Sequence, residues 1–324
     1  MRHETKIKPI QLAELASVVF MAIVVAAANG LQLFYILFPE LGALCSDVLL
    51  RPSGKWAKEP LKLIATPTIA AVGGIVVGRW LPYGVVSILA AMTLGMATVF
   101  ILRSAVAPAI SAGVFPIVFG LTSWLYPLCI FCSLSILAGA LLVWRRSAVG
   151  QNLIENQGID QRAVEVLESP PHGKWWFFAA IYIFVLIVGF VAQVTAWRFI
   201  LFPPLIVMAY EMLGHPETCP WAKRPFPFPA VCCLAALAGV QAEKSLGVNP
   251  IAAAIVMAAT YLVMNGFRLR MPPALAVGLI PFVMKSPSYW YAVSVGLGTT
   301  ALTVYFLVYR RLLILHRRRA MRKT

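Results

Sequence analysis

Apolar stretches of about 20 residues recur along the whole chain, and no other feature constrains the fold as strongly. A helix needs about that many apolar residues to cross roughly 30 Å of hydrocarbon. The composition agrees, because 60% of the residues are hydrophobic and only 12% are charged. The short alternating segments typical of a transmembrane β-barrel are not seen in the sequence. The sequence therefore predicts an all-α fold, a polytopic transmembrane helical bundle that contacts the lipid bilayer.

Short motifs recur about 165 residues later and predict two homologous units. Leu-Phe-Pro at 37–39 recurs at 201–203, and Asp47 corresponds to Glu211 at the same distance from that motif. Trp-Ala-Lys at 56–58 recurs at 221–223. Three further residues, Pro116, Ser123 and Tyr126, recur as Pro281, Ser288 and Tyr291. Matches in a fixed register across a whole unit indicate an internal duplication.

The predicted organisation has two transmembrane units with a polar linker between them. The regions are an N-terminus (1–10), a first unit (11–144), a linker (145–174), a second unit (175–309) and a basic tail (310–324). In the first unit we expect spans at 11–28, 31–50, 63–78, 81–102, 105–121 and 123–144. In the second unit they are at 175–196, 199–213, 229–247, 250–267 and 291–309. Proline interrupts some of these helices: Pro39 is expected to kink the second span, and Pro108 and Pro116 break the fifth.

The basic residues predict the orientation of the bundle. The net charge is +15, and Lys and Arg lie between apolar runs and in the tail. If every segment crosses, 23 of the 27 Lys and Arg residues fall on one side, leaving Arg79, Arg198, Lys244 and Lys285 on the other. Since basic loops are retained in the cytoplasm, we expect both termini on the cytoplasmic side of the cell membrane and about ten to twelve crossings.

The same charges bear on the alternative arrangements and partners of the chain. Inverted repeats with five crossings per unit rank second, because they place one heavily basic set of loops outside. The broken segments either span or re-enter, and the oligomeric state stays open. A nucleic-acid partner is not expected, since the chain has no soluble domain to bind one.

The six cysteines and four histidines suggest no metal or catalytic set. Cys129 and Cys132 have C-x-x-C spacing but lack a second pair, so we interpret them as small buried hydrophobes. His215 is expected in a polar loop. No Ser-His-Asp set or phosphate-binding loop is recognisable. The sequence predicts a protein that is not an enzyme and needs no cofactor.

Two motifs resemble those of the HPP family of integral membrane proteins. They are Leu-Phe-Pro-x-Leu-Gly-Ala at 37–43, followed by a basic loop with Pro60, and Met-Pro-Pro-Ala at 271–274. The resemblance covers most of both units and implies a tandem HPP protein. Some family members are associated with nitrite or nitrate transport. The family is named for a His-Pro-Pro motif, whereas this chain has Met271 in place of the His and Val-Ala-Pro at 106–108. This departure puts any function of that imidazole in doubt.

Three carboxylates lie near the broken segments. Asp47 and Glu211 are either solvated helix ends beside basic loops or groups that face a cavity. Glu40 lies deeper, next to Pro39, and has Pro204 as its counterpart, so it is the better candidate for a protonatable group.

Three arginines precede the later proline breaks. Freed backbone N–H groups and guanidinium charge at Arg103, Arg268 and Arg270 suit an anion, whereas the alternative is topogenic charge at helix ends. The candidate substrate-binding residues are therefore Pro39, Glu40, Asp47, Arg103, Pro108, Pro203, Glu211, Arg268, Arg270, Pro272 and Pro273.

These features favour a secondary transporter or channel for a small solute, such as the anions nitrite and nitrate. Duplicated units with paired helix breaks are typical of transporter sites. The alternatives are a membrane scaffold or accessory subunit, and an exporter of an amphiphilic compound through a wide apolar vestibule. Small residues at 71–74 and 236–239 predict close helix contacts in either case. Trp124 and Tyr126 are expected at the membrane interface.

Overall fold

A computed structural model describes residues 8–155 and 175–321, and these residues form helices with no strand among them. The first half comprises α1 (Pro9–Gly30), η1 (Phe34–Ile36), α2 (Glu40–Leu50), α3 (Lys55–Lys58), α4 (Pro60–Trp80), α5 (Val85–Ile101), α6 (Pro108–Phe119), α7 (Leu125–Arg146) and α8 (Ala148–Glu155). The second half comprises α10 (Trp175–Val194), η2 (Arg198–Leu201), α11 (Pro203–Gly214), α12 (Pro220–Lys223), α13 (Pro227–Leu246), α14 (Pro250–Gly266), α15 (Pro273–Leu279), η3 (Ile280–Val283) and α16 (Tyr289–Met321). The predicted all-α bundle is confirmed.

The two halves contain corresponding elements in the same order. The bounds of α3 and α12, and those of α5 and α14, lie 165 residues apart at both ends. The residue in the left-handed conformation after α5 is Arg103 (φ 47°), and after α14 it is Arg268 (φ 49°). The register found in the sequence is therefore repeated in the secondary structure.

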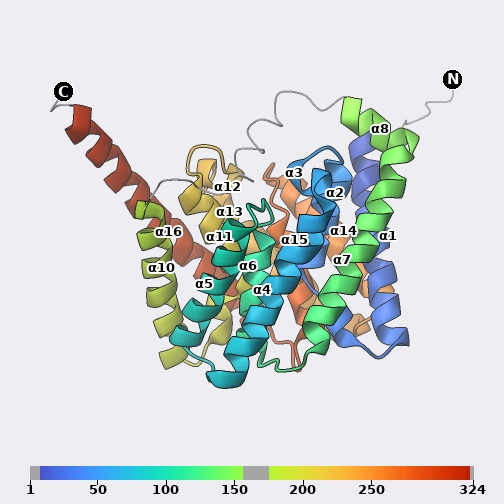
Figure 1. Ribbon diagram of the computed structural model, residues 1–324, viewed down its shortest axis with the longest axis horizontal. Coiled ribbons are helices and arrows are strands. Elements are labelled where there is room, and N and C mark those ends of the chain that lie inside the picture. Colours follow the sequence, from blue (N-terminus) through green and yellow to red (C-terminus); the bar gives the residue numbers. More distant parts are fainter. Residues whose placement is uncertain (1–7, 156–174, 322–324) are drawn as a thin grey trace.

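Long apolar helices stand at the two sides of the bundle. Five helices are long and apolar enough to cross a membrane, namely α1, α4, α7, α10 and α16. Figure 1 shows α1 and α7 along one side and α10 and α16 along the other. They expose large apolar side chains outward, such as Ile23, Ile136 and Phe190. An apolar outer surface of this height is what lipid requires, so the chain is a membrane protein.

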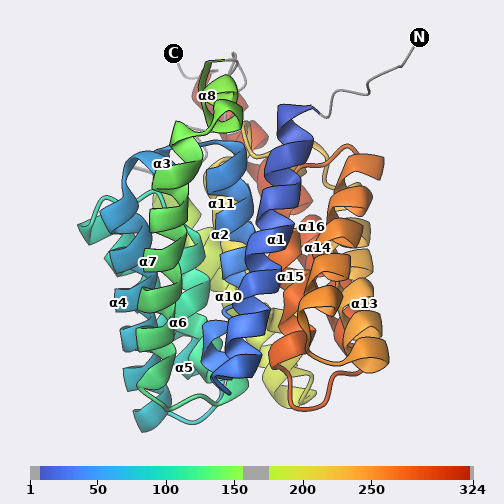
Figure 2. The same cartoon turned by 90° about the vertical axis from the view of Figure 1, so that its right-hand side faces the viewer.

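Short helices occupy the interior between these long ones (Figures 1 and 2). All residues of α11 and α15 are buried, and so are those of α6 up to Val118 and of α2 up to Leu49. A helix that ends at membrane depth leaves backbone groups without intrahelical partners, and lipid cannot satisfy them. Such ends are tolerated only when protein surrounds them, which explains the central position of the short helices.

The predicted kinked span at 31–50 is wrong. Residues 31–39 are irregular apart from η1, and α2 begins only at Glu40, with Pro39 as its N-cap residue. Proline suits this position because the first helical N–H groups have no intrahelical acceptor. Likewise Pro203 begins α11. The predicted linker also differs, since 148–155 form α8; its residues 156–174 lie outside the described part.

Polar contacts among the loops define two ends of the bundle. We call the end with residues 51–62, Arg103, Arg145, 223–224 and 268–270 the basic end. There Lys62 Nζ donates to Arg103 O (3.2 Å), and Arg145 Nε donates to Pro52 O (2.8 Å). The start of α1 and the far end of α16 lie at the same edge of the bundle in Figure 1.

The remaining turns meet at the opposite end. Arg79 Nε donates to Thr122 O (2.9 Å), and Asn29 Nδ2 donates to Val248 O (2.7 Å). Gln193 Oε1 accepts from the backbone N–H of Val85 (2.9 Å). Both halves thus run in the same direction between these two ends. A common direction of the two halves agrees with parallel repeats, and the number of crossings stays a prediction from the sequence.

The halves interlock instead of standing side by side. Helix α1 packs on α14 of the other half, and its counterpart α10 packs on α5. Among the short helices, α2 packs on α15 and α11 packs on α6. Figure 2 shows α1 and α14 next to each other. The short helices of the two halves therefore meet across a shared interface.

Glycines bring α4 onto α6 and α13 onto α15. A Cβ placed on Gly74 would lie 2.0 Å from Gly113 O, and one on Gly239 would lie 2.0 Å from Gly278 O. The predicted close contacts of the small residues at 71–74 and 236–239 are confirmed at these two positions.

Candidate functional site between the two halves

Proline begins each of the four short helices. Pro108, Pro203 and Pro273 are the first residues of α6, α11 and α15, and Pro39 directly precedes α2. Pro272 is the N-cap residue of α15. Proline has a fixed φ that suits the first turn of a helix and no N–H that would need a partner. The predicted breaks therefore act as helix starts, and the packing of α2 on α15 and of α11 on α6 brings them to the interface.

Glu40 is the carboxyl group at the centre of this interface. Its side chain is 2% exposed, and Ser111 Oγ on α6 donates a hydrogen bond to Oε1. Among the described residues, Oε2 has no hydrogen-bond partner. Isolated carboxyl groups at membrane depth are costly and usually functional. Glu40 is thus the most conspicuous polar group of the interior.

Two buried tyrosines, one from each half, lie in the region around Glu40. The phenols of Tyr126 and Tyr291 are both within electrostatic reach of its carboxyl group. Each phenol already donates a hydrogen bond to a carbonyl of a short helix: Tyr126 to Ala112 O (3.1 Å) and Tyr291 to Val277 O (2.8 Å). Both tyrosines are only 1% exposed. The prediction that Tyr126 is an interfacial aromatic is therefore wrong, whereas Trp124 is 47% exposed.

The polar pair is present in one half only. Residues 164 and 165 positions after Glu40 are Pro204 and Leu205, and the residue 165 positions after Ser111 is Ala276. The tyrosines, by contrast, occur in both halves and make the same kind of hydrogen bond. The interface is symmetric in its backbone and asymmetric in its charge.

Asp47 lies one and a half to two turns further along α2, near the basic end. Its side chain is buried and forms an ion pair with Arg51, whose Nε donates to Oδ1 (3.0 Å). An acid four residues before an arginine on a helix is well placed for such a pair. Asp47 thus lies at a helix end beside the basic loop, as one alternative predicted, but it is buried against Arg51 and not solvated.

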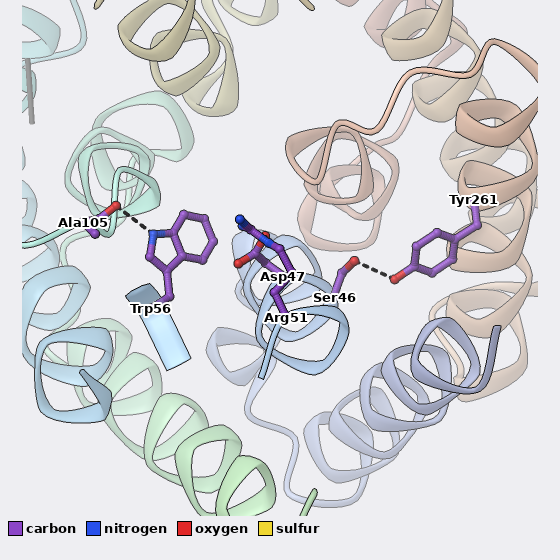
Figure 3. A network of polar contacts seen from close by, with 6 residues as sticks. All are labelled: Ser46, Asp47, Arg51, Trp56, Ala105 and Tyr261. Carbon is purple, nitrogen blue, oxygen red and sulfur yellow. Dashed lines mark hydrogen bonds and ion pairs between the residues drawn. The ribbon is translucent and has the colours of Figure 1, made fainter. Parts of the chain in front are cut away.

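Further polar contacts hold the same end of α2 in place (Figure 3). Tyr261 Oη on α14 donates to Ser46 Oγ (2.7 Å) and also contacts Ser17 Oγ on α1 (2.6 Å). On the other side of α2, Trp56 Nε1 donates to Ala105 O (2.8 Å), just before α6. Sequence reasoning missed Tyr261, because nothing in the order of the residues places α14 beside α1 and α2.

Glu211 is the corresponding acid on α11. It is 6% exposed, so a solvated helix end is wrong here as well. His215 lies in the loop after α11, as predicted, but it is only 9% exposed. Nearby, burial raises the pKa of the Cys219 thiol, and the negative charge of Glu211 raises it further.

The candidate arginines do not reach this interior. Arg103 and Arg268 are exposed at the basic end, as is Arg270. The backbone explains their place, because Arg103 N donates to Phe100 O (3.1 Å) and Ser104 N donates to Val99 O (2.9 Å). Two such hydrogen bonds around a left-handed residue are typical of a helix C-terminus. A positive charge at this place also interacts favourably with the negative end of the helix dipole. Arg268 closes α14 in the same way.

Arg270 has a different neighbour, which the sequence did not indicate. Glu14 on α1 lies within electrostatic reach of Arg270, and Asn265 is also near its carboxyl group. The opposite charges of Glu14 and Arg270 therefore attract α1 and the loop before α15 to each other at the basic end.

At the opposite end, charges pack on aromatic rings. The Arg198 guanidinium lies 4.4 Å from the centre of the Tyr83 ring, and Lys244 Nζ lies 5.2 Å from that of Tyr289. Burial raises the pKa of the Tyr83 phenol, and the charge of Arg198 partly opposes this. These contacts are typical of the membrane interface.

The two cysteines of the C-x-x-C motif differ in burial. Cys129 is buried, as expected, but Cys132 is exposed on α7. In the described part of the chain, no group of three or more His, Cys, Asp or Glu residues is arranged to hold a metal ion. Comparisons with family models, curated proteins and solved structures find no match to this chain.

Proposed function

We propose that this chain is a secondary transporter or channel for a small solute, with its path between the two halves. The observation that carries the proposal is the set of four short buried helices, α2, α6, α11 and α15, which pack on one another across the two halves, with the buried carboxyl group of Glu40 at the start of α2. Helices broken at membrane depth in corresponding places of two repeats are typical of transporter sites. A carboxyl group at that depth is costly to a merely structural bundle.

A small anion such as nitrite or nitrate is the proposed solute. The resemblance to the HPP family implies it, and the basic end supports it. Arg103, Arg268 and Arg270 are exposed there, close to the starts of α6 and α15. Positive charge gathered at one end of a path raises the local concentration of anions. In this proposal the arginines attract the anion and do not bind it inside the bundle.

Flux measurements on the full chain in liposomes test both statements. We expect nitrate or nitrite to leave loaded vesicles faster than from protein-free vesicles. The double variant Arg103→Ala with Arg268→Ala should slow this flux at low ionic strength, with a difference that shrinks in high salt, because salt screens exposed charges. Flux equal to that of empty vesicles would rule out the anion. A double variant without effect would remove the arginines from the proposal.

A membrane scaffold or accessory subunit is the second candidate. The backbone contacts of Gly74 with Gly113 and of Gly239 with Gly278 favour it, because such contacts make a rigid bundle. Proteoliposomes that pass no small solute of either charge, from a protein that is folded and monodisperse, would support this candidate. An exporter of amphiphilic compounds needs a wide apolar vestibule, and buried side chains of the short helices occupy the central interface instead.

A further inference from the structure

Glu40 differs from Asp47 and Glu14 in the charges near its carboxyl group. Asp47 pairs with Arg51, and Glu14 faces Arg270 and Asn265, both near the basic end. Glu40 has no cation at hydrogen-bond distance among the described residues, and its one side-chain partner is the hydroxyl of Ser111. A carboxyl group buried in this way must be explained by something that neutralises it.

The long and short helices that pack on α2 are α1, α6, α7 and α15. Helix α6 contributes Ser111 and α7 contributes Tyr126, while Tyr291 on α16 also lies within electrostatic reach of Glu40. Helix α15 has no titratable side chain, and the only one on α1 is Glu14, at the basic end. On α2 itself, Asp47 is engaged by Arg51, and Cys45 donates to Gly42 O (3.3 Å). No group of this set carries a positive charge toward Glu40.

The two tyrosines cannot satisfy the second oxygen. Tyr126 and Tyr291 each have one O–H, and each donates it to a backbone carbonyl, Ala112 O or Val277 O. Oε2 of Glu40 is therefore buried and has no donor among the described residues. A proton is the smallest group that neutralises a carboxylate, and it requires no further oxygen ligands. A metal cation would need several of them.

The other half of the chain supplies an internal comparison. Glu40 and Ser111 are both replaced there, by Pro204 in the Leu-Phe-Pro register and by Ala276. The packing residues of the same region are kept, including both tyrosines and the paired glycines. The acid and its hydroxyl partner are thus present together in one half and absent together from the other, whereas the scaffold is present in both.

We infer that Glu40 and Ser111 form a proton-binding site, and that the proton is the ion coupled to solute movement through the interface. The reaction is reversible binding: a proton joins the Glu40 carboxylate to give the neutral acid, and release restores the carboxylate. Ser111 holds Oε1 in both states, which leaves Oε2 to bind and release the proton. The statement on coupling rests on the proposed transport function, whereas the proton-binding site does not.

Infrared difference spectra of the full chain in liposomes test the site without any transported solute. Between acidic and basic buffer, we expect a carbonyl stretch of a protonated carboxylic acid to disappear, with a shift of that band in heavy water. Glu40→Gln should remove the band, and Glu59→Gln should keep it. Glu59 is the matched control because its side chain is 45% exposed at the basic end. A band that persists in Glu40→Gln would overturn the inference, as would its absence from the unmodified protein.

Ser111→Ala provides a second variant in case Glu40→Gln does not fold. It introduces the residue found at the corresponding position 276. Loss of the hydrogen bond to Oε1 should shift the frequency of the band without removing it. A band unchanged in Ser111→Ala would contradict the role of the hydroxyl and overturn the paired site.

Flux measurements then test the coupling. An inward proton gradient should drive nitrate accumulation in vesicles with the unmodified protein, and Glu40→Gln should abolish this stimulation while Glu59→Gln retains it. Accumulation driven by a sodium gradient instead would overturn the coupling to protons. If nitrate does not move but the infrared band titrates and disappears in Glu40→Gln, the anion proposal fails and the proton-binding site stands.

Discussion

Replacing Gly74 by alanine tests the tightest helix contact in the first half. The added methyl group would lie 2.0 Å from Gly113 O, 2.9 Å from Gly113 C and 3.1 Å from the Pro116 ring. Two of these atoms belong to the backbone of a buried helix, so no side-chain rotation can make room. Helices α4 and α6 would have to separate by roughly 1 Å or more to restore an ordinary contact.

The neighbouring Gly73 supplies the matched control. An alanine there would meet only the Leu94 side chain, at 3.4 Å. Both substitutions remove a glycine from the same helix, and each gains about 1 kcal/mol of helix propensity. That gain cancels in the comparison, so the difference between the two variants isolates the steric cost. Overpacking of this kind costs about 1–3 kcal/mol, and contact with backbone favours the upper part of that range.

Reversible unfolding by SDS in mixed micelles, followed by tryptophan fluorescence, measures the difference. We expect Gly74→Ala to unfold at a lower SDS fraction than Gly73→Ala, by a free energy of about 1–3 kcal/mol. Gly239→Ala should behave like Gly74→Ala, because its methyl group would also lie 2.0 Å from a backbone oxygen, that of Gly278. Equal stability of Gly73→Ala and Gly74→Ala would refute the close backbone contact.

Three further predictions address the interface and the orientation. Tyr261→Phe removes the hydroxyl that joins Ser17 and Ser46, and it should lower the free energy of unfolding by about 1–3 kcal/mol. Its control, Tyr289→Phe at the exposed opposite end, should change the free energy of unfolding by less than about 0.5 kcal/mol. Arg103 has a left-handed backbone conformation, which glycine adopts without strain and valine does not. Arg103→Gly should therefore raise the free energy of unfolding by up to about 1 kcal/mol, and Arg103→Val should lower it, in the same unfolding assay. A fluorescent protein fused to the C-terminus should fluoresce in cells, because the basic end is expected in the cytoplasm, and an active periplasmic phosphatase fusion at the same place would reverse the orientation.

Much of the fold could be predicted from the sequence because its signals are local. The spans predicted at 11–28, 123–144 and 250–267 end within a few residues of α1, α7 and α14. Apolar length alone determines such helices. The glycine contacts were predictable for the same reason, since small residues recur in register at 71–74 and 236–239. These features depend on a helix and its period, and not on which neighbour it finds.

The site was less predictable because its partners are distant in sequence. Pro39 was expected to kink a helix, but a proline that starts a helix and one that bends it have the same local signal. Tyrosine is a residue type common at the membrane interface, and only the contact of its hydroxyl with Ala112 O shows that Tyr126 is buried. Ser111 is one hydroxyl among many in the sequence, and its place beside Glu40 results from the packing of α6 on α2.

The asymmetry of the interface bears on how such a bundle could work. Because both halves run in the same direction, two equivalent halves would respond alike, and a response confined to one half needs a difference between them. The packing is nearly equivalent, as Gly74 and Gly239 show by their equal distances to the opposing backbone. The difference lies in Glu40 and Ser111, which only the first half contains. A proton that binds there changes the charge of one half alone, at the surface where α2 meets α15. Binding can shift an equilibrium between two arrangements only if the site differs between them, and a buried carboxyl group that gains or loses water contact meets that condition.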